Sequence, residues 1–176
     1  MTFAKMFALL LAAGLFVGCR KSSPPTPAPT PAATTSIDDL LPKQAQPKLR
    51  TMKIYLGAET LDAELALSRD EEMTGMMYRT NILDTDAMLF VLPYNQRANF
   101  WMKNCPESIS AAYINPDGVI EEIHHLEKND TNGVEAATTN IRFVLETSDG
   151  WFTRHHIESG TVLRTEKGTL PETFLK

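Results

Sequence analysis

The chain has 176 residues, of which 43% are hydrophobic and 22% are charged, and its formal net charge is −5. This composition is typical of one globular domain with appended segments, and the acidic balance excludes a broad nucleic-acid-binding surface. Two cysteines are too few for a disulfide scaffold or a four-thiolate zinc site. No apolar run reaches the length of about 18 residues that a transmembrane helix needs.

The N-terminus predicts export and lipid attachment. Lys5 precedes a run of apolar or small residues over 6–17, which is typical of a signal-peptide core and too short to span a bilayer. The run ends at residues 16–19 in Phe-Val-Gly-Cys, which resembles the bacterial lipobox. We therefore expect a lipoprotein signal peptide over residues 1–18 and acyl chains, palmitate among them, on Cys19. An ordinary secretory signal is the alternative.

Lipid on Cys19 makes the membrane a partner of the chain, and two or three acyl chains anchor stably. In enteric-type bacteria, an aspartate directly after the lipidated cysteine signals retention in the inner membrane. This chain has Arg20 at that position, so we expect the protein to be anchored in the outer membrane and to face the periplasm. Residues 22–36 contain five prolines and no charged or large side chain, which predicts a disordered tether over 19–49. The folded domain is expected over 50–176, with Cys105 as its free thiol.

In chain order, alternating apolar residues over 52–56 and 61–67 predict a hairpin. Ser68 and Glu71 then form the capping box of a short helix, which Gly75 weakens or ends. The apolar run over 87–92, stopped by Pro93, predicts a strand buried on both faces.

The second half of the domain predicts further strands and one more helix. Expected strands cover 100–102, 109–114, 119–126, 141–145 and 161–164, and the turn 115–118 joins two of them. A helix carrying Trp151 and Phe152 is expected to be capped by Ser148 or Asp149. The fold class predicted is α+β, a mainly antiparallel sheet, half-open or barrel-like, with two short helices.

Several residue types could carry chemistry, but their spacing favours structural roles. His124 and His125 share a strand and point to opposite faces, and His155 and His156 lack the spacing of a helical zinc site, so we expect neither a metal nor another cofactor. Cys105 lacks a hydrolase signature, which favours a loop thiol over a nucleophile served by His124 or His155. The soft donors pack the core or, as an alternative, handle Cu(I). They are Met73, Met76, Met77, Met88, Met102 and Cys105.

The segment 100–104, Phe-Trp-Met-Lys-Asn, is the most unusual stretch. Its strand pattern places Trp101 beside Lys103, as an aromatic platform next to a cation, and Arg79 follows the methionine-rich helix. We predict a shared concavity built by Arg79, Trp101, Lys103 and Asn104 that binds a polar, anionic or sugar-like ligand. The alternative is a structural pairing in which a carboxylate neutralises the two cations.

Several motifs in register resemble the domain of unknown function 192 family over about residues 52–166. They are Gly-Met-Met-Tyr-Arg at 75–79, Met-Leu-Phe-Val at 88–91, Phe-Trp-Met-Lys-Asn at 100–104, Ala-Tyr-Ile at 112–114, Asp-Gly at 117–118, Glu-Ile-His at 122–124, Val-Leu-Glu at 144–146 and Gly-Trp-Phe at 150–152. The resemblance implies a fold and an exported location but no established activity or catalytic residue. The chain departs from the family at Ser110, where an aspartate is usual.

These observations leave three hypotheses open. The first is a non-enzymatic, lipid-anchored periplasmic module that binds a small ligand or an envelope partner, without nucleic acid. The second is an envelope hydrolase that uses Arg79, Lys103 and Asn104 with a carboxylate such as Glu121 or Glu122. The third is Cu(I) handling through methionines and Cys105, which requires several sulfur atoms to face one point.

Overall fold

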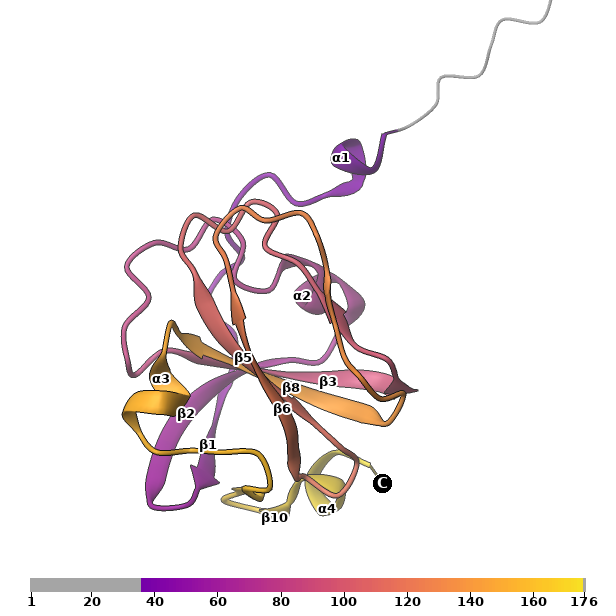
Figure 1. Ribbon diagram of the computed structural model, residues 1–176. Helices are drawn as coiled ribbons and strands as arrows, with labels where there is room; N and C mark the ends of the chain where they lie inside the picture. Colours follow the sequence, from indigo (N-terminus) through magenta and orange to yellow (C-terminus); the bar gives the residue numbers. More distant parts are fainter. Residues whose placement is uncertain (1–35, 176) are drawn as a thin grey trace, which may run out of the picture. The chain divides into compact units, whose positions relative to one another are not determined.

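A computed structural model describes residues 36–175 of the chain (Figure 1). The expected signal peptide, the lipid site at Cys19 and most of the expected tether lie outside the described residues. Within residues 36–175 no helix is both long and apolar enough to cross a membrane.

Eight strands form one curled sheet in the order β10-β9-β1-β2-β3-β8-β5-β6 (Figure 1). All neighbouring strands in this sheet are antiparallel except β2 and β3, which run parallel. The α+β prediction with a mainly antiparallel, half-open sheet is therefore confirmed. The strands are β1 (Thr51–Leu56), β2 (Glu59–Ala66), β3 (Ala87–Gln96), β5 (Ile109–Ile114), β6 (Ile120–Leu126), β8 (Ile141–Ser148), β9 (Leu163–Thr165) and β10 (Gly168–Thr169).

Smaller elements surround this sheet. A two-stranded ladder pairs β4 (Asn99–Phe100) with β7 (Val134–Glu135). The described residues contain four short helices, which are α1 (Ile37–Leu40), α2 (Arg69–Thr74), α3 (Trp151–Arg154) and α4 (Leu170–Phe174). Helix α4 adds one to the two helices expected in the domain 50–176, whereas α1 precedes that domain. The short α4 begins at a Thr169–Glu172 capping box, a local signal that the sequence analysis missed.

Three differences from the sequence prediction have a clear physical reason. Strand β3 continues through Pro93, which is tolerated because the pairing with β8 is irregular between Val91 and Gln96. Strand β4 ends at Phe100, so Trp101 and Met102 lie in the loop that follows it. Helix α3 is capped by Gly150 rather than by a side chain, because strand β8 extends to Ser148 and the Ser148 hydroxyl donates to Asp84 instead.

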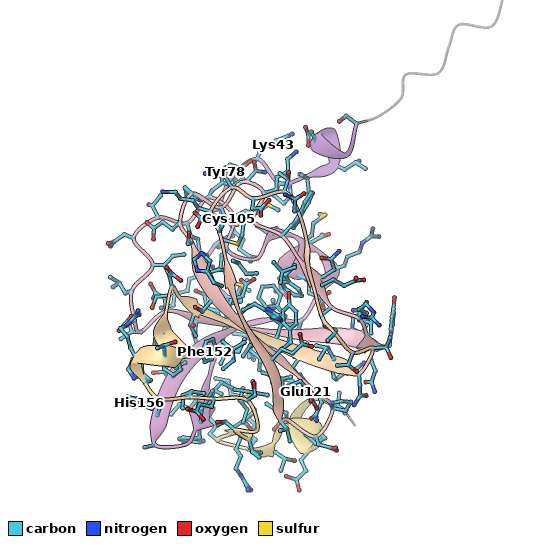
Figure 2. The ribbon with its side chains drawn as sticks, in the orientation of Figure 1. Lys43, Tyr78, Cys105, Glu121, Phe152 and His156 are labelled. Atoms are coloured by element: carbon cyan, nitrogen blue, oxygen red, sulfur yellow. The ribbon has the colours of Figure 1, made fainter. Side chains whose placement is uncertain are left out.

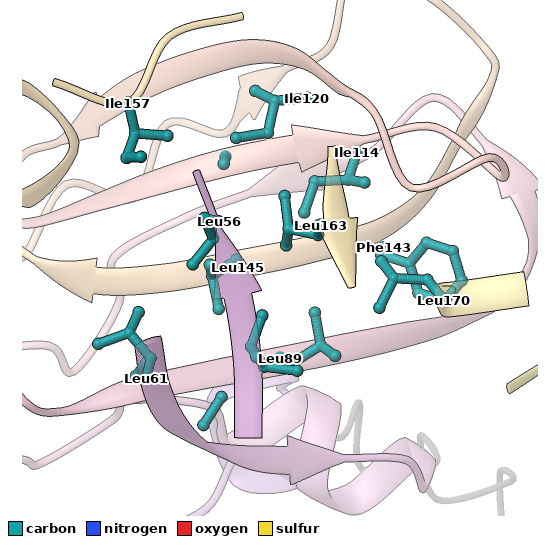
Figure 3. Packing of buried hydrophobic residues seen from close by; sticks show 14 of the residues in the cluster. Leu56, Leu61, Leu89, Ile114, Ile120, Phe143, Leu145, Ile157, Leu163 and Leu170 are labelled. Atoms are coloured by element: carbon teal, nitrogen blue, oxygen red, sulfur yellow. The ribbon is translucent and has the colours of Figure 1, made fainter. Parts of the chain in front are cut away.

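Both faces of the central strands are buried, as the apolar runs of β3 and β5 predict. One face packs against the curled-over β1 and β2, α3 and α4, and Figure 3 shows this cluster with Leu89, Leu145 and Phe143 of the central strands. The other face carries Phe90 and Tyr113 and is covered mainly by loops. The second face therefore depends on how those loops are held.

Helix α2 and its exit hold the first of these loops. Ser68 and Glu71 form the expected capping box, and Gly75 ends the helix with φ +44°. After this turn Met76 and Met77 enter the second core, and the Tyr78 N–H donates to the Asn104 carbonyl at 2.8 Å. The turn thus joins the segment 75–79 to the segment 100–104.

Replacing Gly75 by alanine tests the turn. A Cβ there would lie 3.2 Å from the Phe90 ring, in addition to the strain of a positive φ, whereas a Cβ at Gly160 (φ +91°) meets nothing within 4 Å. We expect Gly75→Ala to lower the free energy of unfolding by about 2 kcal/mol and Gly160→Ala by about 1 kcal/mol, measured by urea denaturation. Equal losses would show that the Phe90 contact does not matter.

Candidate functional site

Arg79 is engaged in a two-pronged ion pair with Glu64 of β2. Its Nη1 lies 2.6 Å from Glu64 Oε1 and its Nη2 lies 2.9 Å from Oε2. Glu64 Oε2 also accepts from the Leu49 N–H at 2.7 Å. Side-chain exposure is only 18% for Arg79 and 9% for Glu64, so this cation already has a largely buried carboxylate partner.

The electrostatics of the pair are consistent with this geometry. Burial by itself raises the pKa of Glu64, but the hydrogen bonds from Arg79 and Leu49 outweigh it and hold that pKa below its ordinary value. The hydrogen bond from Glu64 raises the pKa of Arg79 in turn. Both groups therefore stay charged at neutral pH.

The other three predicted site residues lie near the segment 75–79 but engage other partners. The Lys103 ammonium pairs with the Asp38 carboxylate of α1, and the Lys103 hydrogen bond lowers the pKa of Asp38. Asn104 adopts φ +60° and places its Nδ2 3.9 Å from the Met77 sulfur. Trp101 is 37% exposed. Arg79 lines one hollow and Trp101 lines another, and Lys103 and Asn104 line neither.

The largest of three hollows described here is a cleft of about 450 Å³ between β2, the loop before β3, and α3. It exists because β2 pairs with β3 only through Glu64–Ala66, so the first half of β2 has no strand beside it on that edge. Five carboxylates and the basic groups Lys48 and His155 line it. The carboxylates are Glu59, Asp62, Glu64, Asp84 and Asp86.

Cross-links between elements fix the cleft walls. Asp84 accepts from the Ser148 hydroxyl at 2.6 Å and from the Arg154 guanidinium. These bonds, that from Arg154 foremost, lower the pKa of Asp84. His155 stacks on Trp151 with ring centroids 4.3 Å apart, and its Nδ1 lies 3.3 Å from Glu59. The cleft is therefore a rigid, largely acidic cavity.

A second hollow of about 300 Å³ adjoins this cleft, because Lys48, Glu64 and Asp86 line both. Arg79 lines only the second hollow. The Glu64–Arg79 pair therefore stands at the junction of the two spaces.

The smallest hollow, of about 40 Å³, lies under α2 and contains Glu146 of β8. Glu146 is 4% exposed, and its Oε2 has no hydrogen-bond partner among the described residues. Burial raises the pKa of Glu146 to about 8, although the charge of Arg79 lowers it in part. Glu146 is therefore a neutral acid at neutral pH, placed among apolar and sulfur-bearing side chains.

Cys105, which Figure 2 labels, borders the same hollow. Burial raises the pKa of this thiol to about 12, and the neighbouring Glu146 contributes to the rise. The protonated thiol is a poor nucleophile, which disfavours the catalytic alternative for Cys105.

The two histidines of β6 contact different partners on its two faces. His124 lies 2.9 Å from Glu122, whereas His125 contacts Asp149 and Glu127. Among the residues that the structure describes, no group of three or more His, Cys, Asp or Glu is placed to hold a metal ion.

The acidic cleft and the buried Glu146 were not predicted from the sequence. The cleft acids come from two segments that only the short parallel β2–β3 pairing brings together. Glu146 directly follows the strand pattern of 141–145, and its place in the motif Val-Leu-Glu at 144–146 was the available signal.

The model of the domain of unknown function 192 family, described as Uncharacterized ACR, matches residues 52–165. The chain belongs to this family. Three of its motifs contribute to the lining of the small hollow: Gly75, Met76 and Met77 from the first, Phe100 and Trp101 from the second, and Glu146 from the third. Ser110 stands where the family usually has an aspartate. Its hydroxyl accepts from the Gly150 N–H at 2.9 Å and so fixes the start of α3.

Two solved structures share the fold. One is a protein of Sinorhizobium meliloti 1021 described as a candidate transcription regulator, with 24% identity, a TM-score of 0.64 and coverage of 69% of this chain and 98% of that chain. The other is a Novosphingobium aromaticivorans protein of unknown function, with 23% identity, a TM-score of 0.63 and coverage of 76% and 99%. No curated protein matches the chain.

Removing Arg79 tests the ion pair. Arg79→Ala leaves the buried Glu64 carboxylate without its cation, and we expect it to lower the free energy of unfolding by about 3 kcal/mol. Lys53→Ala is the matched control, because Lys53 and its partner Asp62 are both about half exposed, and its loss should be much smaller than that of Arg79→Ala. Urea denaturation measures both, and similar losses would contradict a structural role for the buried pair.

Glu146→Gln tests the neutral acid. Between the ordinary pKa of 4.5 and about 8 the folded chain keeps a proton on Glu146 that the unfolded chain releases. Wild-type stability therefore falls as pH rises through this window, by at most about 1.4 kcal/mol per pH unit from this residue. Urea denaturation at several pH values should show that the free energy of unfolding of the variant rises relative to that of wild type as the pH increases through that window. Glu135→Gln, an exposed change, should show no such gain.

Proposed function

We propose that this family member is a lipid-anchored protein of the bacterial envelope whose folded domain binds a small ligand in the acidic cleft. The observation that carries the proposal is the 450 Å³ cleft, because its volume falls within the range of small-molecule sites. Its walls are cross-linked before any ligand arrives, through Asp84, Ser148 and Arg154. Such a preformed site binds with little ordering cost.

The lining indicates the chemistry of the ligand. Carboxylates accept hydrogen bonds and do not donate them when ionised, so the cleft suits a molecule rich in hydroxyl or ammonium donors. An anion is disfavoured, because five carboxylates line the cleft and the guanidinium groups beside it, of Arg79 and Arg154, are already paired with Glu64 and Asp84. The proposed ligand class is therefore an amino sugar or a similar donor-rich molecule, rather than the anionic ligand also considered from the sequence.

The hydrolase hypothesis has less support from this geometry. Its proposed groups Arg79 and Lys103 are bound to different carboxylates. Glu146, the most perturbed acid, has no hydrogen bond to either of them among the described residues. A general acid–base site needs its groups within hydrogen-bond reach of one another.

A titration with simple sugars tests the binding proposal. Glucosamine, glucose and glucose 6-phosphate carry a cation, no charge and an anion on similar frames. NMR shifts of backbone amides should move around Glu59, Asp84 and His155 with glucosamine, less with glucose, and not with the phosphate. Glu59→Gln should weaken glucosamine binding, whereas the exposed Glu135→Gln should not. A stronger response to the phosphate, or no response to any of the three, overturns the proposal.

The anchor is supported by the apolar run 6–17, by Cys19 and by the proline-rich segment that follows. Cys19→Ala should abolish the acyl mass and release the protein from the membrane fraction, while the domain still folds. Mass spectrometry and fractionation of the outer and inner membranes check this expectation. An unchanged acyl mass and membrane partition in the variant would contradict the anchor.

A further inference from the structure

Four sulfur-containing residues line the small hollow under α2. Met73, Met76, Met77 and Cys105 all border it, together with Glu146. Its volume of about 40 Å³ admits one ion or one or two water molecules and excludes an organic ligand. Met88 and Met102 are also buried in the second core but do not line the hollow. Met76 and Met77 belong to the same core and, unlike those two, also border the hollow.

The carboxyl group in this hollow has no structural explanation in the described residues. Glu146 lies nine-tenths or more buried, and its Oε2 is without a hydrogen bond. An unsatisfied buried polar group costs about 1–3 kcal/mol, so a core that served packing alone would be more stable with an apolar side chain there. A buried carboxyl group without a partner is expected where the hollow binds a ligand.

We propose that this hollow is a binding site for a soft monovalent metal ion, Cu(I), held by the sulfur atoms of Cys105, Met76 and Met77. Thiolate and thioether donors select Cu(I) over hard or borderline cations. The thiol of Cys105 loses its proton to solvent as the Cu–S bond forms, so cation and thiolate together bring no net charge into the interior. This site goes beyond the acidic cleft, with which it shares no lining residue.

The sulfur atoms of the proposed ligands make only long, weak hydrogen bonds. The Met77 sulfur has a long contact of 3.9 Å from Asn104 Nδ2, and the Cys105 thiol donates at 3.6 Å to the Lys103 carbonyl, a bond that deprotonation removes. All three ligand residues are buried. Metal binding therefore breaks no strong hydrogen bond.

Glu146 is a positioning residue in this proposal. Its carboxylic acid proton can be donated to the metal-bound sulfur of Cys105, which gives the carboxyl group the partner it lacks. Trp101 and Met73 line the same hollow and are both more than one third exposed. They supply the mouth of the site, where an indole face attracts a cation. Glu72 adds a half-buried carboxyl group at that mouth.

Anaerobic transfer of Cu(I) from the bicinchoninate complex tests the proposal. The full chain carries Cys19→Ser, so that Cys105 is the only thiol. We expect one Cu(I) to move from the chelator to each chain, with thiolate-to-copper absorption in the ultraviolet and quenching of Trp101 fluorescence. Zn(II) should not compete. Retention of all the copper by the chelator means that the hollow holds water only and overturns the proposal.

Matched variants separate ligation from packing. Met76→Leu with Met77→Leu keeps the volume and removes the thioethers, so it should lose the transfer, whereas Met88→Leu should keep it. Glu146→Leu should weaken Cu(I) binding about tenfold, and Glu146→Gln, which still donates, should restore it. Equal loss in the Met88→Leu control, or full affinity in the double methionine variant, overturns the site. Glucosamine binding is expected to persist in all four, so the two proposals fail independently.

Discussion

The burial of β3, β8 and β5 on both faces is the constraint on which the rest of this structure depends. One face is covered conventionally, by the curled-over strands and two short helices. The other face has almost no regular structure above it and relies on the turn after α2 and the segment 97–106. Irregular backbone must find hydrogen-bond partners as it crosses an apolar surface. The bond between Tyr78 and Asn104 is one such solution, and hollows remain where the loops do not fill the surface.

The Glu64–Arg79 pair organises this looser face. It ties β2 to the loop after α2, and through the Leu49 N–H it also ties down the segment that leads into β1. Gln46 makes a related bond to the Gly75 carbonyl at 2.9 Å. The segment 46–49 therefore lies along the site rather than apart from it.

Two carboxyl groups on this face illustrate how partners decide protonation. Glu64, Met88 and Glu146 are paired in register across β2, β3 and β8, so the two acids are separated by two strand spacings, about 10 Å. Glu64 has a guanidinium and a backbone N–H and remains ionised. Glu146 has neither and keeps its proton. On one side of Met88, the ionised Glu64 lines the acidic cleft. On the other side, the protonated Glu146 lines the small hollow.

Local patterns in the sequence determined much of the fold. The capping box at Ser68, the apolar runs of β3 and β5 and the turn at 115–118 depend on neighbours within a few residues, so the sequence alone predicted them. The family motifs likewise predicted that the segments 75–79 and 100–104 matter, and the fold brings these segments into contact. The extent of β4 was wrong because a strand needs a partner, and β7 offers one for only two residues.

The sites were decided by tertiary structure. Sequence analysis placed Arg79, Trp101, Lys103 and Asn104 in one concavity, but the partner of Arg79 lies fifteen residues away on β2 and that of Lys103 lies on α1. The acidic cleft arises from the partial β2–β3 pairing, and the sulfur-lined hollow from loops that meet over β8. Such juxtapositions join residues far apart in the chain, and their register and burial follow from packing. No periodicity in the sequence encodes them.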